Sequence, residues 1–124
     1  MIQADKEKYS DVLEHSIDYL EKKGFEDIKA DINGYETPKS FNKVGSDVSI
    51  TPDIVATKAG QKHFFDIGLK SEKPTLLKSK WLFLKTFSNL KSYQFKLITT
   101  RGHYKFTQNM LEDINLSNKS LIKI

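Results

Sequence analysis

Apolar side chains recur at helical spacing in the first part of the chain. In a helix with about 3.6 residues per turn they fall on one side and leave charged residues on the other. Gly24 suits the end of this helix, because glycine adopts left-handed backbone angles at little cost. Residues 25–32 then alternate loosely, which predicts a first strand. The positions on the apolar side are Tyr9, Val12, Leu13, Ser16, Ile17 and Leu20.

A polar stretch separates this strand from the next one. Residues 33–51 contain Gly34, Pro38 and Gly45 among many polar side chains. The stretch is longer than most connections in a compact domain, and long loops of this kind often carry function. We therefore expect an excursion from the core in which any strand is short.

The next segment has the pattern of a β-hairpin. Residues 52–57 and 62–70 favour two antiparallel strands, and Lys58-Ala59-Gly60-Gln61 favours a tight turn between them. Side chains alternate between the two faces of a strand, so the second strand has one apolar face and one mixed face. The apolar face carries Phe65, Ile67 and Leu69, and the mixed face carries Phe64, Asp66, Gly68 and Lys70.

The second half of the chain alternates helices and strands. Pro74 suits the first turn of a helix that ends near residue 93, and the apolar run 81–84 predicts that this helix is deeply buried. The elements that follow are a strand at 95–100, a short helix at 106–114 and an edge strand at 121–124. The order α-β-β-β-α-β with a small tail predicts an α/β fold, in which a mixed central sheet is flanked by helices. We expect residues 1–124 to form a single domain.

The composition excludes several chemistries. The 124 residues include no cysteine, which rules out disulfides, zinc–thiolate sites, iron–sulfur clusters and thiol nucleophiles. No apolar run approaches the ~18 residues that cross a bilayer. The opening Met1-Ile2-Gln3-Ala4-Asp5-Lys6 has no apolar signal core. We therefore expect a cytoplasmic protein with no membrane partner.

Basic residues are concentrated in the second half of the chain. The formal net charge is +4, acids are frequent before residue 37, and lysines dominate between residues 58 and 105. Because Arg101 is the only arginine, lysines would hold a nucleic-acid partner by its phosphates, with weak sequence preference. The candidate contacts are Lys58, Lys62 and Lys73. The same pattern also fits a lysine-rich surface that meets only solvent.

Two acids in the predicted hairpin suggest a metal site. Asp53 begins one strand and Asp66 lies in the other, and neighbouring strands run about 5 Å apart. Carboxylate oxygens on rigid elements suit a hard divalent cation, and a nearby lysine suits hydrolysis of a phosphodiester. Asp66 and Lys70 share one face of their strand, opposite the apolar face.

Pro52-Asp53, the hairpin and Phe65-Asp66-Ile67 together resemble the PD-(D/E)XK nuclease superfamily, which includes restriction endonucleases and Holliday junction resolvases. The resemblance extends roughly over residues 9–100 and implies a restriction endonuclease-like core. It also implies Mg²⁺- or Mn²⁺-dependent phosphodiester hydrolysis, as in an endodeoxyribonuclease, with DNA as the favoured nucleic-acid partner. Asp53 and Asp66 would be the metal ligands, and the carbonyl of Ile67 would be a candidate third ligand.

The sequence departs from the family pattern at one position. The family places a lysine two residues after the strand acid, where this chain has Gly68. We expect Lys70, the next residue on the same face, to be the catalytic lysine, with its flexible side chain using the space beside Gly68. The competing interpretation is that Gly68 marks a bulge, Lys70 meets solvent and catalysis has been lost.

Other acids and other functions stay open. The family often supplies an acid from the first helix, and Glu14 is the candidate, although its position suits an ordinary solvated acid equally well. Asp47 is a second helper candidate, for which a turn-forming role is favoured. Besides cleavage of DNA, the sequence permits an inactive nuclease-fold binding or accessory protein, or a protein-interaction domain. Short chains of this kind often act on duplex DNA as homodimers, so a homodimer is one open arrangement.

Overall fold

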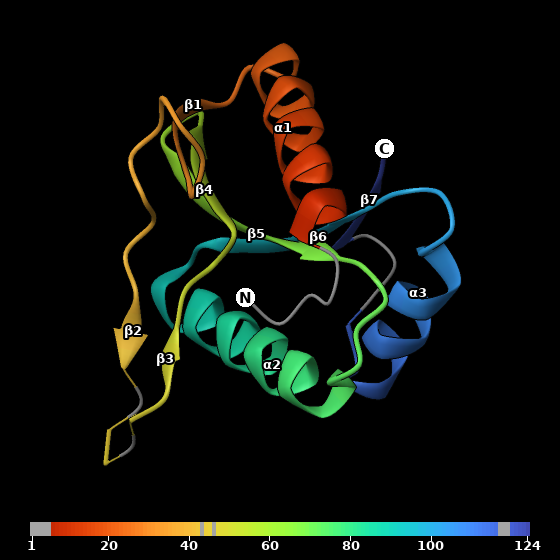
Figure 1. Cartoon of the computed structure of the whole chain (residues 1–124). Helices are drawn as coiled ribbons and strands as arrows, with labels where there is room; N and C mark the ends of the chain where they lie inside the picture. The colour runs from red at the N-terminus through yellow and green to blue at the C-terminus, as the bar shows by residue number, and fades with distance from the viewer. Residues whose placement is uncertain (1–5, 43, 46, 117–119) are drawn as a thin grey trace.

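A five-stranded mixed sheet lies at the centre of the protein in the computed structural model, which describes residues 6–42, 44–45, 47–116 and 120–124 (Figure 1). The strand order is β1-β4-β5-β6-β7. β1, β4 and β5 pair antiparallel, whereas β5, β6 and β7 pair parallel. The strands are β1 (Glu26–Ala30), β4 (Ile54–Lys58), β5 (Gln61–Gly68), β6 (Gln94–Thr99) and β7 (Leu121–Lys123).

Helices cover both faces of this sheet (Figure 1). α1 (Lys6–Lys22) packs on one face, and α2 (Pro74–Lys91) and α3 (Tyr104–Asp113) pack on the other. α2 and α3 also form the crossovers between the parallel strands, which need a long connection of this kind. The predicted α/β architecture, with a mixed sheet between helices, is therefore confirmed.

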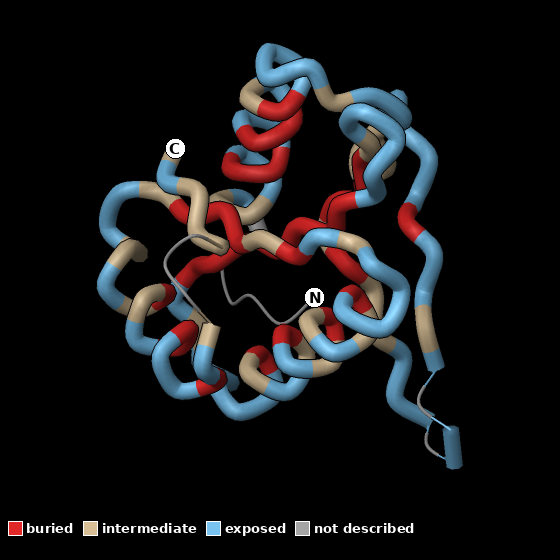
Figure 2. The backbone as a smooth tube through the Cα atoms, turned by 180° about the vertical axis from the view of Figure 1, so that it is seen from behind, coloured by how far each residue is buried: buried red, intermediate tan, exposed pale blue. Residues whose placement is uncertain are grey.

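The alternation of side chains along β5 divides the core in two. Phe65 and Ile67 belong to the cluster that contains Leu13 of α1. Phe64 belongs to the other cluster, together with Trp81 of α2. Figure 2 shows the buried residues concentrated in the sheet and on the sides of the helices that face it. Because each face of β5 is covered, β5 is buried from His63 to its end.

The turn between β4 and β5 has two residues. Ala59 and Gly60 both have positive φ, 51° and 77°, as in the turns that best match the twist of a hairpin. The flanking pair is Lys58 with Gln61, and the pairing continues to Ile54 with Phe65. The predicted hairpin and its tight turn are present.

The polar stretch between β1 and β4 forms an arm that extends away from the sheet (Figure 1). The arm comprises residues 37–51, of which the structure describes all but 43 and 46. It includes a two-stranded ribbon of β2 (Phe41–Asn42) and β3 (Ser49–Ile50). Most of the arm is exposed (Figure 2). The expected excursion with a short strand thus contains two very short strands.

Gly68 lies at a close contact between β5 and α3. A Cβ atom at this position would lie 2.6 Å from both Cγ2 and Oγ1 of Thr107. Thr99 Oγ1 donates a hydrogen bond to the carbonyl of Gly68, at 2.7 Å. The register of β5 with β6 is continuous through the pair Gly68 and Thr99, so the proposed bulge at Gly68 is wrong. The absence of a side chain allows α3 to approach the sheet.

Among the described residues, no helix has both the length and the apolar character needed to span a membrane. Residues 1–5, on which the expectation about a signal segment partly depends, lie outside this part of the chain.

We expect Gly68→Ala to lower the free energy of unfolding by about 1–3 kcal/mol, because the added methyl group overlaps Thr107. Thr107→Ala in the same chain removes both atoms at 2.6 Å and should recover part of this loss. Urea denaturation of the two single variants and the double variant measures the coupling. An equal cost of Gly68→Ala in both backgrounds would contradict the contact.

Candidate active site

The β4–β5 hairpin brings Asp53 and Asp66 together. Ile54 pairs with Phe65, so the next position outward on each strand is Asp53 on one side and Asp66 on the other. The backbone N–H of Asp53 donates to Asp66 Oδ1 at 3.0 Å, and the N–H of Ile67 donates to Asp53 Oδ2 at 2.8 Å. Each carboxylate is therefore fixed to the backbone of the other strand.

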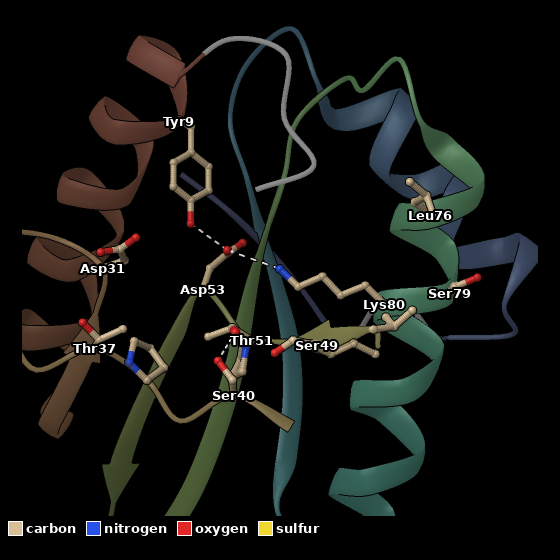
Figure 3. A pocket seen from close by; sticks show the side chains of 14 residues that line it. Tyr9, Asp31, Thr37, Ser40, Ser49, Thr51, Asp53, Leu76, Ser79 and Lys80 are labelled. Atoms are coloured by element: carbon tan, nitrogen blue, oxygen red, sulfur yellow. Dashed lines mark hydrogen bonds and ion pairs between the residues drawn. The ribbon is translucent and has the colours of Figure 1, made fainter. Parts of the chain in front are cut away.

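Lys80 of α2 contacts both carboxylates, and Figure 3 shows its contact with Asp53. Its Nζ lies 3.0 Å from Asp66 Oδ1 and 3.4 Å from Asp53 Oδ1. Only 13% of the Lys80 side chain is exposed, against 10% for Asp53 and 0% for Asp66. The ammonium group thus bridges two acids in a nearly water-free environment, where ionic contacts are much stronger than on a surface.

Two aromatic side chains complete the network. The hydroxyl of Tyr9, from α1, donates to Asp53 Oδ1 at 2.6 Å. The indole N–H of Trp81, from α2, donates to Asp66 Oδ2 at 2.8 Å. With the backbone and Lys80 contacts, every oxygen of the two carboxylates accepts at least one hydrogen bond. The orientation of both acids is therefore set by the protein.

Burial and charge separate the pKa values of the two acids. Burial, followed by the negative charge of Asp53, raises the pKa of Asp66 to about 8. Burial acts in the same direction on Asp53, but Lys80 and hydrogen bonds outweigh it, so the pKa of Asp53 is lowered. Two neighbouring acids with such different environments favour different protonation states near neutral pH.

The same environment keeps the proton donors protonated. Burial alone would lower the pKa of Lys80, but the two carboxylates raise it above its ordinary value. Burial and the charge of Asp53 raise the pKa of the Tyr9 hydroxyl. At neutral pH, Lys80 is therefore a cation and Tyr9 a neutral hydrogen-bond donor.

A pocket of about 490 Å³ opens onto Asp53 and Lys80. Figure 3 shows Tyr9 and Lys80 approaching Asp53 from different helices. The arm forms one wall and α2 another, and Asp66 lies behind Asp53 and Lys80, buried from solvent. Besides Tyr9, the hydroxyl groups on the walls belong to Thr37, Ser40, Ser49, Thr51 and Ser79.

Lys70 lies away from this network. It follows the end of β5 and is exposed, and its backbone N–H donates to His103 Nδ1 at 2.9 Å. The space beside Gly68, which its side chain was expected to use, is filled by Thr107. The expectation that Lys70 leans back past Gly68 is therefore wrong, and the lysine at the carboxylates is Lys80.

The other expected site residues are spread over the protein. Glu14 is exposed on α1, and the helix contributes Tyr9 to the site instead. Ile67 contacts the site through its N–H group, which binds Asp53. Asp47 is exposed in the arm, outside the residues that line the pocket.

The three expected nucleic-acid lysines fall in two places. Lys58 and Lys62 flank the hairpin turn, so Lys58 lies about 17 Å along the strand from Asp53. Lys73 directly precedes α2 and is exposed. Lys58 and Lys62 are therefore separated from the acids by most of the length of β4.

Sequence reasoning missed Lys80, Tyr9 and Trp81 as partners of the acids. Tyr9 and Trp81 were assigned to the core, where their rings do pack. Lys80 follows Leu77 by three positions and precedes Leu84 by four, which places it on the buried side of α2. A lysine inside an apolar helical stripe was the available signal.

The cluster offers two carboxylates as potential ligands for a cation. Within the described ranges, no group of three acidic or histidine side chains could hold a metal ion. Asp53 and Asp66 do place oxygens around one cation, since the Lys80 ammonium lies against both. Mg²⁺ is often bound by one or two carboxylates, with water and phosphate oxygens as the remaining ligands.

No family model, curated protein or solved structure matches this chain. A proposal about the chemistry of this site therefore has to rest on the geometry of Asp53, Asp66 and Lys80.

We expect the free energy of unfolding of the wild type, relative to Asp66→Asn, to fall as pH rises from 3.8 to about 8. In this window the folded protein keeps a proton on Asp66 that the unfolded chain has released. The stabilisation from this proton is therefore complete below the unfolded-state pKa of 3.8 and is lost as pH rises through the folded-state pKa of about 8. Between these values the free energy of unfolding falls by at most about 1.4 kcal/mol per pH unit. Urea denaturation at several pH values measures it.

Asp113→Asn is the matched control for this experiment. Asp113 pairs with Lys78 at 2.7 Å, but its side chain is 55% exposed. Because this side chain stays in contact with solvent, its replacement controls for the loss of one acidic residue without altering the buried cluster. A constant difference for Asp66→Asn would show that burial does not hold a proton at this position.

Proposed function

We propose that the protein is a metal-dependent nuclease that hydrolyses phosphodiester bonds, with DNA as the favoured substrate. The observation that carries this proposal is the Lys80 Nζ within 3.4 Å of both Asp53 and Asp66, at the end of an open pocket. Acids that can hold a divalent cation, with a positive side chain beside them, suit phosphodiester hydrolysis.

The position of the lysine supports a PD-(D/E)XK-type core with one substitution. Position 68, where that family has its lysine, is closed by Thr107. A lysine from α2 reaches the same acids from the helix layer instead. The Pro52-Asp53 pair, the hairpin and Asp66 keep the rest of the motif. In this proposal the lysine comes from α2 instead of β5, and its charge still lies beside the acids.

Asp53 and Asp66 would hold Mg²⁺ or Mn²⁺. Such a cation supplies Lewis acidity and lowers the pKa of a coordinated water. The Lys80 ammonium beside the acids would be suited to stabilising negative charge on a phosphate. Tyr9 and Trp81 hold the carboxylates in place through their hydrogen bonds.

A second candidate is a binding protein that keeps this core without catalysis. It is favoured by the complete burial of Asp66 and by the donors that already occupy both carboxylates. In that case Lys80 and the two acids would serve as a buried polar network that specifies the packing of α2.

We expect the wild type to cleave DNA with Mg²⁺ or Mn²⁺ and to be inactive in excess chelator. Lys80→Met should reduce the rate about a hundredfold or more, because it removes the charge beside the acids. Lys70→Met is the matched control and should keep the wild-type rate within about twofold, since its exposed side chain lies off the site. Cleavage of plasmid, single-stranded DNA and RNA is followed on gels.

Lys80→Arg separates loss of chemistry from loss of folding. Removing the ammonium leaves two acids uncompensated, which costs about 3–5 kcal/mol for a buried pair. Arginine keeps the charge, so circular dichroism should show a folded protein, while the changed geometry should still reduce cleavage. Equal rates for the Lys80 and Lys70 variants would contradict the assigned role. Binding without cleavage of any substrate would favour the second candidate.

A further inference from the structure

A second pocket combines partly exposed aromatic rings with lysines. Its volume is about 440 Å³, and it lies on the side of the sheet covered by α2. The rings come from β2, from α2 and from the residue before β6, so three separate segments build it. The residues that carry the inference are Phe41, Phe87, Tyr93, Lys39, Lys62 and Lys91.

The rings form one continuous cluster over the buried Phe64. Phe41 and Phe87 have ring centroids 4.5 Å apart, and Phe64 and Tyr93 have centroids 5.5 Å apart. Phe41, Phe87 and Tyr93 are only partly buried, so their rings reach the pocket as well as the core. A planar apolar ligand could therefore stack here without a rearrangement of the core.

The lysines give this pocket a positive charge. Lys39, Lys62 and Lys91 are exposed, and none of the described residues that line the pocket is acidic. The Lys62 ammonium lies 5.3 Å from the centroid of Tyr93, and that of Lys91 lies 6.0 Å from the centroid of Phe87. Lys29 also lines the pocket, but it pairs with Glu36 at 3.7 Å.

We infer that this pocket binds a short stretch of single-stranded nucleic acid. The rings would stack against a base, and the lysines would hold the neighbouring phosphates, which is how many single-strand sites combine affinity with low sequence preference. A duplex fits less well, because its bases are stacked inside the helix. Binding requires neither a metal ion nor Lys80, so the inference goes beyond the proposed cleavage reaction.

One segment of the arm lines both pockets. Pro38 and Ser40 face the pocket at Asp53, whereas Lys39 and Phe41 face the aromatic pocket. This alternation is the one expected of an extended chain. A strand held in the aromatic pocket therefore lies against the wall of the pocket that contains the acids.

The test measures binding of a short fluorescent oligothymidine by anisotropy, in chelator and at several salt concentrations. The double variant Lys62→Gln/Lys91→Gln should bind more weakly, with a log–log salt slope smaller in magnitude by about 1.4. The matched control is Lys22→Gln/Lys23→Gln, which removes the same charge. Lys23, directly after α1, also lies over a tyrosine ring, 5.5 Å from the centroid of Tyr19 of α1.

An abasic oligomer tests the stacking contact. Phe87→Leu and Tyr93→Leu should each weaken oligothymidine binding about 5- to 100-fold, and should leave binding of the abasic oligomer unchanged. Circular dichroism checks that both variants fold, and the lysine variants test the pocket without altering its core.

Three outcomes would overturn the inference. These are equal affinity of the two lysine double variants, ring variants that bind oligothymidine like the wild type, or a duplex that binds as tightly as the single strand. If the wild type binds oligothymidine but does not cleave DNA when metal is supplied, only the nuclease proposal is contradicted, because all binding is measured without metal.

Discussion

The ammonium group of Lys80 contacts the carboxylates of both Asp53 and Asp66 in a region from which solvent is nearly excluded. Removing the charges of Lys80 and Asp53 from water costs roughly several kcal/mol for each ion, which only close contacts and hydrogen bonds can offset. Those contacts come from all layers of the fold, since Tyr9 belongs to α1, Trp81 to α2 and the acids to the central hairpin. The ion network therefore ties the two helix layers to the sheet at one position.

The same network sets the protonation of the two acids. Asp66 is fully buried, so its pKa is raised, and the charge of Lys80 opposes this shift. Two acids that are held this close repel each other when both are ionised, unless a cation lies between them. Lys80 meets that requirement within the protein, and a divalent ion would meet it in the proposed enzyme. The pocket at Asp53 connects the cluster to solvent.

The sequence predicted the parts of the site that depend on local structure. A two-residue turn at Ala59 and Gly60 fixes the register of the hairpin, and this register alone sets Asp53 opposite Asp66. The parts that depend on distant contacts were not predicted. Thr107 is 39 positions from Gly68, and no local pattern shows that it fills the space beside that glycine. The choice of Lys70 failed for this reason.

A manganese soak of crystals of the wild type, read by anomalous diffraction, tests most directly whether the two acids form a cation site. The account predicts one Mn²⁺ peak bound to carboxylate oxygens of both Asp53 and Asp66, with the Lys80 ammonium displaced from between them or turned toward an anion. Crystals of Asp66→Asn should lack this peak. Saturating Mn²⁺ that leaves the Lys80 contacts unchanged and gives no peak at these residues would contradict the account.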